Sequence, residues 1–443
     1  MDAQSPDTLN TSEESTLQPL EEANASKPTV LVVHASVGSG HRSAAKAIGA
    51  ALELLRDEDG LAPNDLNVEV LDILDFGRIR FDGDKTASMF TGATRPFYDF
   101  TWRYGLTGRL LWGGGTIWAR IMFPSFVEYV RKVKPCAIVC THITAANVAV
   151  SARMITGQDF AIICVPTDYE VEGLWPHLYT DLFCVADEHM AETLRPRRVP
   201  EARIAITGIP TNPTFRETYD REATRERYGL PQDKQVVLAL AGATLPRPYV
   251  HFRKAVNALI PYLHSFDNLH LVVVAGNDTE YAQHVRTMRE EYGLKNLTVL
   301  DYVDEMAALM SASDLVVCKS GGLVVTECLC AQVPMILVGK AYGQEKSNVL
   351  MLTASGAALH VTTPRELINA LRHIDHHPES TRAMLINASF LRHPDAAIDI
   401  AHNTLALSGF TTDDGDVPDE AAKAPRKKHF IHFYFGGKPA HTR

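Results

Sequence analysis

Short runs of apolar residues alternate along this chain with longer stretches that are rich in helix-forming residues. Residues 29–33, 137–140 and 315–318 are continuous apolar or β-branched runs, which are typical of strands buried on both faces of a parallel sheet. Residues 42–56 and 144–155 are rich in alanine and contain no proline, which favours helices. Repeated strand–helix alternation predicts an α/β protein with parallel, doubly wound sheets.

The alternation falls into two series. The expected strands of the first series cover residues 29–33, 67–71, 137–140 and 161–165, and those of the second cover residues 236–241, 270–275, 297–300 and 315–318. Pro213 and the charged run 216–227 separate them, and a chain of 443 residues with 46% hydrophobic content can form two cores. We therefore expect two Rossmann-like domains, at residues 28–212 and 213–408.

The two ends of the chain differ in composition from these domains. Residues 1–27 hold six acidic residues and little that could form a core, which predicts a disordered acidic tail. Residues 409–443 are acidic at first and end in a basic and aromatic stretch, which predicts a flexible tail. That last stretch would either anchor at a membrane surface or fold onto the first domain.

The net charge, the cysteines and the lengths of the apolar runs indicate which partners and which cellular compartment to expect. A net charge of -10 argues against nucleic acid as the main partner. The seven cysteines lie mostly in apolar runs without metal-ligand spacing, so we expect reduced cysteines in a cytoplasmic protein. No run of 18 apolar residues and no basic-then-apolar leader are seen, so any membrane contact is expected to be peripheral.

Residues 81–134 combine aromatic and basic side chains. Trp102, Trp112 and Trp118 lie there, and residues 95–134 hold seven basic and two acidic residues. This combination favours the headgroup zone of an anionic membrane. The alternative is an ordinary aromatic core with a solvated basic rim.

The strand at 315–318 runs into Lys319, Ser320, Gly321 and Gly322, and a helix is expected from residue 323. The first amides of a helix lack partners within it and carry partial positive charge, so this turn could bind a diphosphate, with Lys319 beside it. Glu327 follows one to two turns later, where a carboxylate can accept hydrogen bonds from a ribose. The alternative is a plain strand–turn–helix with a solvated glutamate.

Other strand ends carry further candidates for the same cleft. Gly242 ends the strand at 236–241 at the carboxyl edge of its sheet, where ligands of open α/β sheets bind. Asp168 follows the strand at 161–165 and could orient or deprotonate an acceptor hydroxyl, or merely cap the following turn.

A second glycine turn, with Gly38, Gly40 and His41, follows the strand at 29–33. One interpretation is a dinucleotide-binding fingerprint with Ser43 in place of its third glycine, although Asp72 lies too far along for the usual acidic residue. In the other, the imidazole of His41 accepts the proton of an acceptor hydroxyl. His41 could also simply cap the turn.

These motifs together resemble the family of monogalactosyldiacylglycerol synthase and the processive diacylglycerol glucosyltransferases, which is related to the lipid II N-acetylglucosaminyltransferase. The resemblance covers roughly residues 28–405 and implies the GT-B glycosyltransferase fold, with the two domains facing across a cleft. It implies a uracil pocket at Val303 and Met306, and a diphosphate site at residues 320–322. Glu327 would hold the ribose.

The resemblance also assigns roles to residues on both sides of the cleft. Gln344, Glu345 and Asn348 would lie near the sugar and phosphates. Gly38, Gly40, His41 and Trp175 would face the acceptor. The chain departs from the family at Glu172, where relatives usually carry histidine, and Glu170 adds a second negative charge, which puts the identity of the acceptor in question.

The expected function is that of a UDP-sugar-dependent hexosyltransferase with a membrane lipid, most simply diacylglycerol, as acceptor, and the resemblance implies inversion at the anomeric carbon. His41 or Asp168 would remove the acceptor proton. Without an Asp-x-Asp motif we expect no obligatory metal, and the UDP-sugar serves as co-substrate with no further cofactor. The alternatives are another UDP-sugar enzyme of the same fold, such as a UDP-N-acetylglucosamine 2-epimerase or a lipid II-type N-acetylglucosaminyltransferase.

Overall fold

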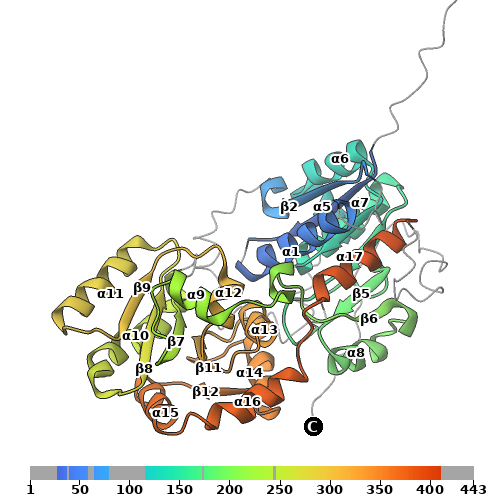
Figure 1. Cartoon of the computed structure of the whole chain (residues 1–443). Coiled ribbons are helices and arrows are strands. Elements are labelled where there is room, and N and C mark those ends of the chain that lie inside the picture. The colour runs from blue at the N-terminus through green and yellow to red at the C-terminus, as the bar shows by residue number, and fades with distance from the viewer. Residues whose placement is uncertain are drawn as a thin grey trace, which may run out of the picture.

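The computed structural model describes residues 27–36, 39–57, 64–78, 115–171, 174–242 and 246–410, and the side chains of residues 115–118 and 246–249 lie outside this description. The described chain forms two lobes, each built on one six-stranded parallel sheet with helices packed on its faces (Figure 1). The predicted fold class, two doubly wound α/β domains, is confirmed.

The first lobe holds the sheet with strand order β2-β1-β3-β4-β5-β6. Its strands are β1 (Thr29–His34), β2 (Asn67–Asp72), β3 (Ala137–Cys140), β4 (Ala161–Cys164), β5 (Leu182–Val185) and β6 (Ile204–Ile206). Its helices are α1 (Ser39–Asp57), α5 (Gly115–Met122), α6 (Pro124–Val133), α7 (Ile143–Thr156) and α8 (Glu188–Leu194), with short 3-10 turns η1 (Ile73–Phe76), η2 (Arg195–Arg197) and η3 (Glu201–Arg203). Every residue of β1, β3, β4 and β5 is buried, because helices cover both faces of the sheet.

The second lobe repeats this plan with strand order β12-β11-β10-β7-β8-β9. Its strands are β7 (Gln235–Leu240), β8 (Leu269–Val274), β9 (Leu297–Leu300), β10 (Leu315–Cys318), β11 (Met335–Val338) and β12 (Ala358–Val361). Its helices are α9 (Arg221–Arg227), α10 (Pro246–Leu259), α11 (Thr279–Glu291), α12 (Met306–Ser311), α13 (Gly322–Cys330), α14 (Glu345–Ala354), α15 (Pro364–His376) and α16 (Ser380–Ser389), with 3-10 turns η4 (Pro213–Arg216) and η5 (Ile260–Ser265).

The last described helix, α17 (Ala396–Leu407), lies outside the lobe that precedes it in sequence. It crosses to the first lobe and packs beside α1, as Figure 1 shows for the two helices. Ile400, Ala401 and Leu405 are buried in the same cluster as Val30 and Val32 of β1. The second domain was expected to cover residues 213–408, but its last helix, α17, packs on the first lobe. This packing is possible because an apolar helix face can cover either sheet.

Both sheets reverse their direction of winding next to the strand that begins the lobe. The reversal lies between β1 and β3 in the first sheet and between β7 and β10 in the second. Ligands of doubly wound sheets bind at the carboxyl ends of the strands at such points. His41, in the first turn of the helix that follows β1, and residues 319–322, which follow β10, lie at these points, so the fold places both predicted motifs at binding edges.

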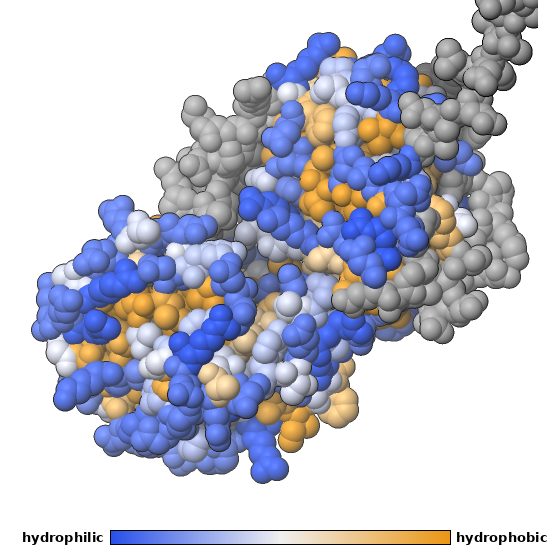
Figure 2. All heavy atoms as spheres, turned by 45° about the horizontal axis from the view of Figure 1, so that its top comes forward, coloured by the Kyte–Doolittle hydropathy of each residue, from blue (hydrophilic) through white to orange (hydrophobic). Residues whose placement is uncertain are grey.

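Apolar and hydrophilic residues are mixed on the surface of the two lobes, as is usual for folded domains. On the face shown in Figure 2, apolar residues come to the surface in several groups separated by hydrophilic ones. Scattered exposed apolar side chains are ordinary for folded domains.

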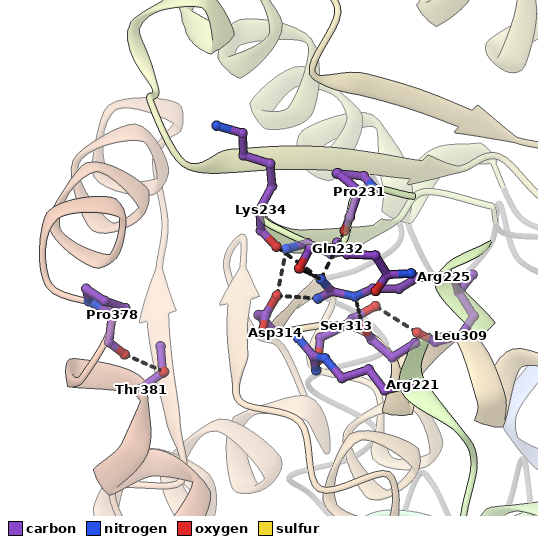
Figure 3. Close-up of polar contacts among 12 residues, drawn as sticks. Arg221, Arg225, Pro231, Gln232, Lys234, Leu309, Ser313, Asp314, Pro378 and Thr381 are labelled. Atoms are coloured by element: carbon purple, nitrogen blue, oxygen red, sulfur yellow. Dashed lines mark hydrogen bonds and ion pairs between the residues drawn. The ribbon is translucent and has the colours of Figure 1, made fainter. Parts of the chain in front are cut away.

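A buried arginine stabilises the amino-terminal edge of the second sheet, which lies opposite the carboxyl edge that carries the predicted motif. Arg225 of α9 is 2% exposed, and its guanidinium donates to Asp314 Oδ2 at 2.7 Å. Its other N–H groups reach the main-chain carbonyls of Pro231, Gln232, Lys234 and Ala312 (Figure 3). Asp314 in turn accepts from the Val236 amide at 2.7 Å. One charged side chain thus ties α9 and the loop before β7 to the start of β10.

We expect Arg225→Met to lower the free energy of unfolding by about 3 kcal/mol, because it removes the buried partner of Asp314 and leaves several main-chain carbonyls without their donor. Arg221→Met is the matched control, since Arg221 also pairs with Asp314 but its side chain is 43% exposed. An exposed pair contributes about 1 kcal/mol or less. Urea unfolding of both variants measures the difference, and equal losses would contradict the role given to Arg225.

Candidate functional site

A cleft of about 390 Å³ lies between the lobes, at the carboxyl edges of both sheets. The first lobe lines it with Ser39, Gly40, His41, Ser43, Thr167 and Asp168. The second lobe lines it with Leu240, Gly242, Val274, Gly276, Tyr302, Val303, Met306, Met310, Cys318, Lys319, Gly321, Gly322, Leu323, Val324, Glu327, Gln344 and Glu345. The two predicted motifs therefore face one another across a single space.

His41 lies in the first turn of α1, and its hydrogen bonds define its tautomer. Nδ1 lies 2.9 Å from the carbonyl oxygen of Thr141 and 2.9 Å from Thr167 Oγ1. A carbonyl oxygen can only accept, so Nδ1 carries the proton and Nε2 keeps its lone pair. Within the part of the chain that the structure describes, Nε2 makes no hydrogen bond.

Burial lowers the pKa of His41, and the nearby Asp168 carboxylate and the Thr141 carbonyl oppose this shift without overcoming it. The imidazole is therefore neutral at neutral pH. A neutral, fixed imidazole with a free Nε2 on a cleft wall can accept a proton from a bound hydroxyl.

The opposite wall begins with the turn between β10 and α13. Gly321 is the N-cap of α13, and no side chain of the described residues caps the helix. The first amides of α13 consequently have no side-chain partner and remain available for an anion. Lys319 adds a positive charge here and forms an ion pair with Glu345 at the start of α14.

Gly322 is required for a reason other than phosphate binding. A Cβ at this position would lie 2.0 Å from the carbonyl oxygen of Thr167 and 2.9 Å from Asp168 Oδ1. The glycine therefore permits the close approach of the two lobes. At Gly321 a Cβ would lie 3.7 Å from Val324 Cγ1, an ordinary van der Waals contact, so the approach of the lobes does not require glycine at that position.

Glu327 lies on the cleft-facing side of α13 and lacks a charge partner among the described residues. Desolvation raises its pKa to about 7. A carboxyl group in this position can accept hydrogen bonds from the two hydroxyls of a ribose, as predicted from its spacing to the glycine turn.

The far end of the cleft is mainly apolar. Val303 and Met306, the predicted uracil contacts, line the cleft; Met306 begins α12 and Val303 lies three residues before it. Gly242 also lines it, and a Cβ there would lie 2.5 Å from the amide nitrogen of Gly276. Glycine is thus needed where the loops after β7 and β8 touch, next to the apolar slot that Val303 and Met306 line.

Several predicted site residues lie elsewhere. Ser320, in the turn between β10 and α13, is 4% exposed and Asn348 is fully buried, and neither of them lines the cleft. Trp175 is 2% exposed and packs against Phe183 in the core, so the structure does not bring it to the cleft. Gly38 and Glu172 lie outside the described residues.

Sequence reasoning did not anticipate some of the residues that shape the site. Thr141 and Thr167 orient His41, and Tyr302, which is 63% exposed, lines the cleft beside Val303. Thr141 could have been anticipated only from the order of strands in the sheet. It follows β3, and β3 lies next to β1, the strand that precedes His41.

The region expected to contact a membrane is described only in part. Residues 79–114 lie outside the described chain, and of the remainder Phe123 and Phe126 are buried in the core. Ile121 is 52% exposed. Among the described residues no helix is long and apolar enough to cross a bilayer, and no group of three His, Cys, Asp or Glu side chains is arranged to hold a metal ion.

The class of protein follows from this arrangement. Two doubly wound lobes that bring their switch points to one cleft form the GT-B fold, as predicted. Two family models match the chain: the monogalactosyldiacylglycerol (MGDG) synthase model at residues 41–211 and the glycosyltransferase family 28 C-terminal domain model at residues 249–400. The resemblance to this family is therefore confirmed, with one model for each lobe.

The similar proteins of known name include processive diacylglycerol beta-glucosyltransferases of Bacillus species. The Bacillus licheniformis protein is 29% identical over 55% of this chain and 61% of its own length. The Bacillus subtilis protein is 31% identical over 49% of this chain and 56% of its own length. The Bacillus cytotoxicus protein is 26% identical over 81% and 86%. The first two alignments thus span less than two thirds of those relatives.

Solved structures share the fold at low sequence identity. A Staphylococcus aureus MnaA structure with UDP covers 87% of this chain and 98% of its own, with 11% identity and a TM-score of 0.57. Acinetobacter baumannii MurG covers 84% and 98%, with 16% identity and a TM-score of 0.52. These similarities support the two-lobed fold.

The raised pKa of Glu327 predicts a pH-dependent contribution to stability. Its folded-state pKa of about 7 lies above the ordinary value of 4.5, so unfolding releases a proton between these pH values. The free energy of unfolding should therefore fall as the pH rises through this window, by up to about 3 kcal/mol from this group. Glu327→Gln should lack this contribution, as measured by urea unfolding at pH 5 and pH 8. Parallel pH profiles for both proteins would show that Glu327 is not desolvated.

Proposed function

We propose that this chain is an inverting glycosyltransferase that moves a hexosyl group from a UDP-sugar to a membrane lipid, with diacylglycerol as the acceptor. The observation that carries the proposal is the pairing, across one cleft, of a neutral histidine with an uncapped helix start beside a lysine. The names of the Bacillus relatives support diacylglycerol as the acceptor.

The second lobe would hold the donor. The apolar slot at Val303 and Met306 takes the uracil, and Glu327 accepts hydrogen bonds from the ribose hydroxyls. The diphosphate lies at the first amides of α13, near Lys319. Gln344 and Glu345, at the start of α14, then lie within reach of the sugar.

The reaction would be a single displacement. His41 Nε2 takes the proton of the acceptor hydroxyl as its oxygen forms a bond to the anomeric carbon on the face opposite the diphosphate. The bond from that carbon to the diphosphate oxygen breaks, and UDP leaves with the electron pair, which inverts the configuration. The α13 amides and Lys319 stabilise the charge that develops on the diphosphate.

These groups supply positive charge at the leaving group from the chain itself. We therefore propose that transfer does not require a divalent metal ion, with the UDP-sugar as the only co-substrate. The acceptor is a lipid, so the protein would work at a membrane surface. The exposed Ile121 and the basic residues around it would belong to the contact, together with the aromatic residues of 81–134.

The direct test is product analysis with the full chain. We expect a panel of UDP-sugars and phospholipid vesicles that contain diacylglycerol to yield a glycosyl-diacylglycerol, detected by mass spectrometry, with a rate that EDTA does not change. Vesicles without diacylglycerol are the control. An epimerised UDP-sugar formed from donor alone would instead identify a 2-epimerase, and transfer to a different lipid would contradict the acceptor.

The role of His41 predicts a specific kinetic change. His41→Ala should lower kcat by about 10²-fold to 10⁴-fold, the usual contribution of a general base, with little change in the donor KM. The wild-type rate should rise with pH through a pKa below 6.5, because the pKa of His41 is lowered by burial. His189→Ala, an exposed histidine on α8, is the matched control and should keep the wild-type rate. A His41→Ala variant with normal kcat would remove His41 from the reaction.

A further inference from the structure

Asn348 on α14 is fully buried, and every polar atom of its side chain has a hydrogen-bond partner. Nδ2 donates to Asp168 Oδ1 at 2.9 Å and to the Ser320 carbonyl oxygen at 2.9 Å. Oδ1 accepts from the Tyr169 amide at 2.9 Å. The side chain is therefore saturated by the protein and cannot also contact a sugar or phosphate without losing one of these bonds.

The three partners come from the two sides of the cleft. Asp168 and Tyr169 belong to the loop after β4 of the first lobe, whereas Ser320 belongs to the donor turn after β10. The position needs two donors and one acceptor in a planar group, which only an amide side chain supplies. An aspartate of the same shape would oppose both the Asp168 carboxylate and the Ser320 carbonyl.

Neighbouring contacts bring the lobes together at the same place. The Tyr169 hydroxyl lies 3.2 Å from Thr326 Oγ1 of α13. Ser347 Oγ donates to the Glu170 carboxylate at 2.6 Å, in an exposed position. The missing side chain of Gly322 lets its backbone lie against Thr167. Asn348 is the buried polar centre of this interlobe contact.

Asp168 connects this interlobe contact to the proposed reaction, because its carboxylate lines the cleft. Its Oδ1 is held by Asn348, and the carboxylate lines the cleft near His41. Its negative charge favours the protonated form of His41. When His41 takes a proton, the resulting imidazolium needs such a carboxylate at a fixed distance.

We infer that Asn348 is a positioning residue, which fixes the Asp168 carboxylate beside His41 and ties that pair to the donor turn through the Ser320 carbonyl. This inference rests on the proposed function for its kinetic part. It replaces the expected direct role of Asn348 at the sugar and phosphates with an indirect one. Because the bonds cross the cleft, Asp168 is held in this orientation only while the lobes are closed on the donor turn.

A double-mutant cycle tests whether Asn348 acts through Asp168. Asn348→Ala should lower kcat by about 10-fold to 100-fold, the range for hydrogen bonds to a charged group, with a smaller change in the donor KM. In an Asp168→Asn background, the same change should have little further effect on kcat, because the carboxylate to be positioned is absent. Additive effects would overturn the inference.

Two further variants separate this role from a general loss of stability. Asn348→Asp keeps the size and the acceptor for the Tyr169 amide but loses both donors, so kcat should fall as in Asn348→Ala. Ser347→Ala removes the neighbouring exposed interlobe bond and should leave kcat unchanged. A normal kcat in Asn348→Asp, or an equal loss in Ser347→Ala, would overturn the inference.

Hydrogen–deuterium exchange of the full chain tests the contact without any activity. The Tyr169 amide should exchange about tenfold faster or more in Asn348→Ala, because its acceptor is gone, and should keep its wild-type rate in Ser347→Ala. Unchanged protection in Asn348→Ala would overturn the inference. If the wild-type chain transfers no sugar, the proposed function fails, while the exchange result still decides whether Asn348 holds the interlobe contact.

Discussion

The site depends on how closely the two lobes approach at one point. The backbone of Gly322, at the start of α13, lies against Thr167 and Asp168 of the opposite lobe. A single added carbon would have to displace that backbone, since it would lie 2.0 Å from a carbonyl oxygen. Proton transfer and departure of a leaving group need donor and acceptor walls fixed to within fractions of an ångström. The packing of the turn after β10 against the loop after β4 therefore sets the distance between the donor wall and the acceptor wall of the cleft.

The close approach of the two lobes also affects the electrostatics of the cleft, through the burial of its ionisable side chains. Desolvation raises the pKa of Glu327 and lowers the pKa of His41, so burial pushes both groups toward their neutral forms. Lys319 lies beside the start of α13 and forms an ion pair with Glu345. The first backbone amides of α13 therefore supply partial positive charge at the donor turn, while burial favours the neutral forms of Glu327 and His41, the groups expected to exchange hydrogen bonds or protons with ligands.

The sequence predicted the repeated strand–helix plan because long apolar runs identify strands that are covered on both faces. The strands at 137–140, 297–300 and 315–318 have the predicted bounds. The strands β5, β6, β11 and β12 were not predicted. β6 has only three residues, and β12 has an exposed residue between buried ones. β5 and β11 are apolar runs of only four residues, and all of them are buried. Of the candidate site, His41, Asp168, Glu327 and the residues of the donor turn other than Ser320 reach the cleft, whereas Trp175 is part of the core.

By itself, the sequence determined the two doubly wound sheets, the glycine turns that follow β1 and β10, and the carboxylate and imidazole available there. Only the tertiary structure decided which of these groups meet. His41 and Thr141 are 100 positions apart, and Asn348 and Asp168 are 180 apart. Local patterns of apolar and polar residues report the burial of each element, but partners across a domain interface depend on how whole lobes pack. For that reason the roles of Asn348 and Gly322 could be assigned only once both lobes were in place.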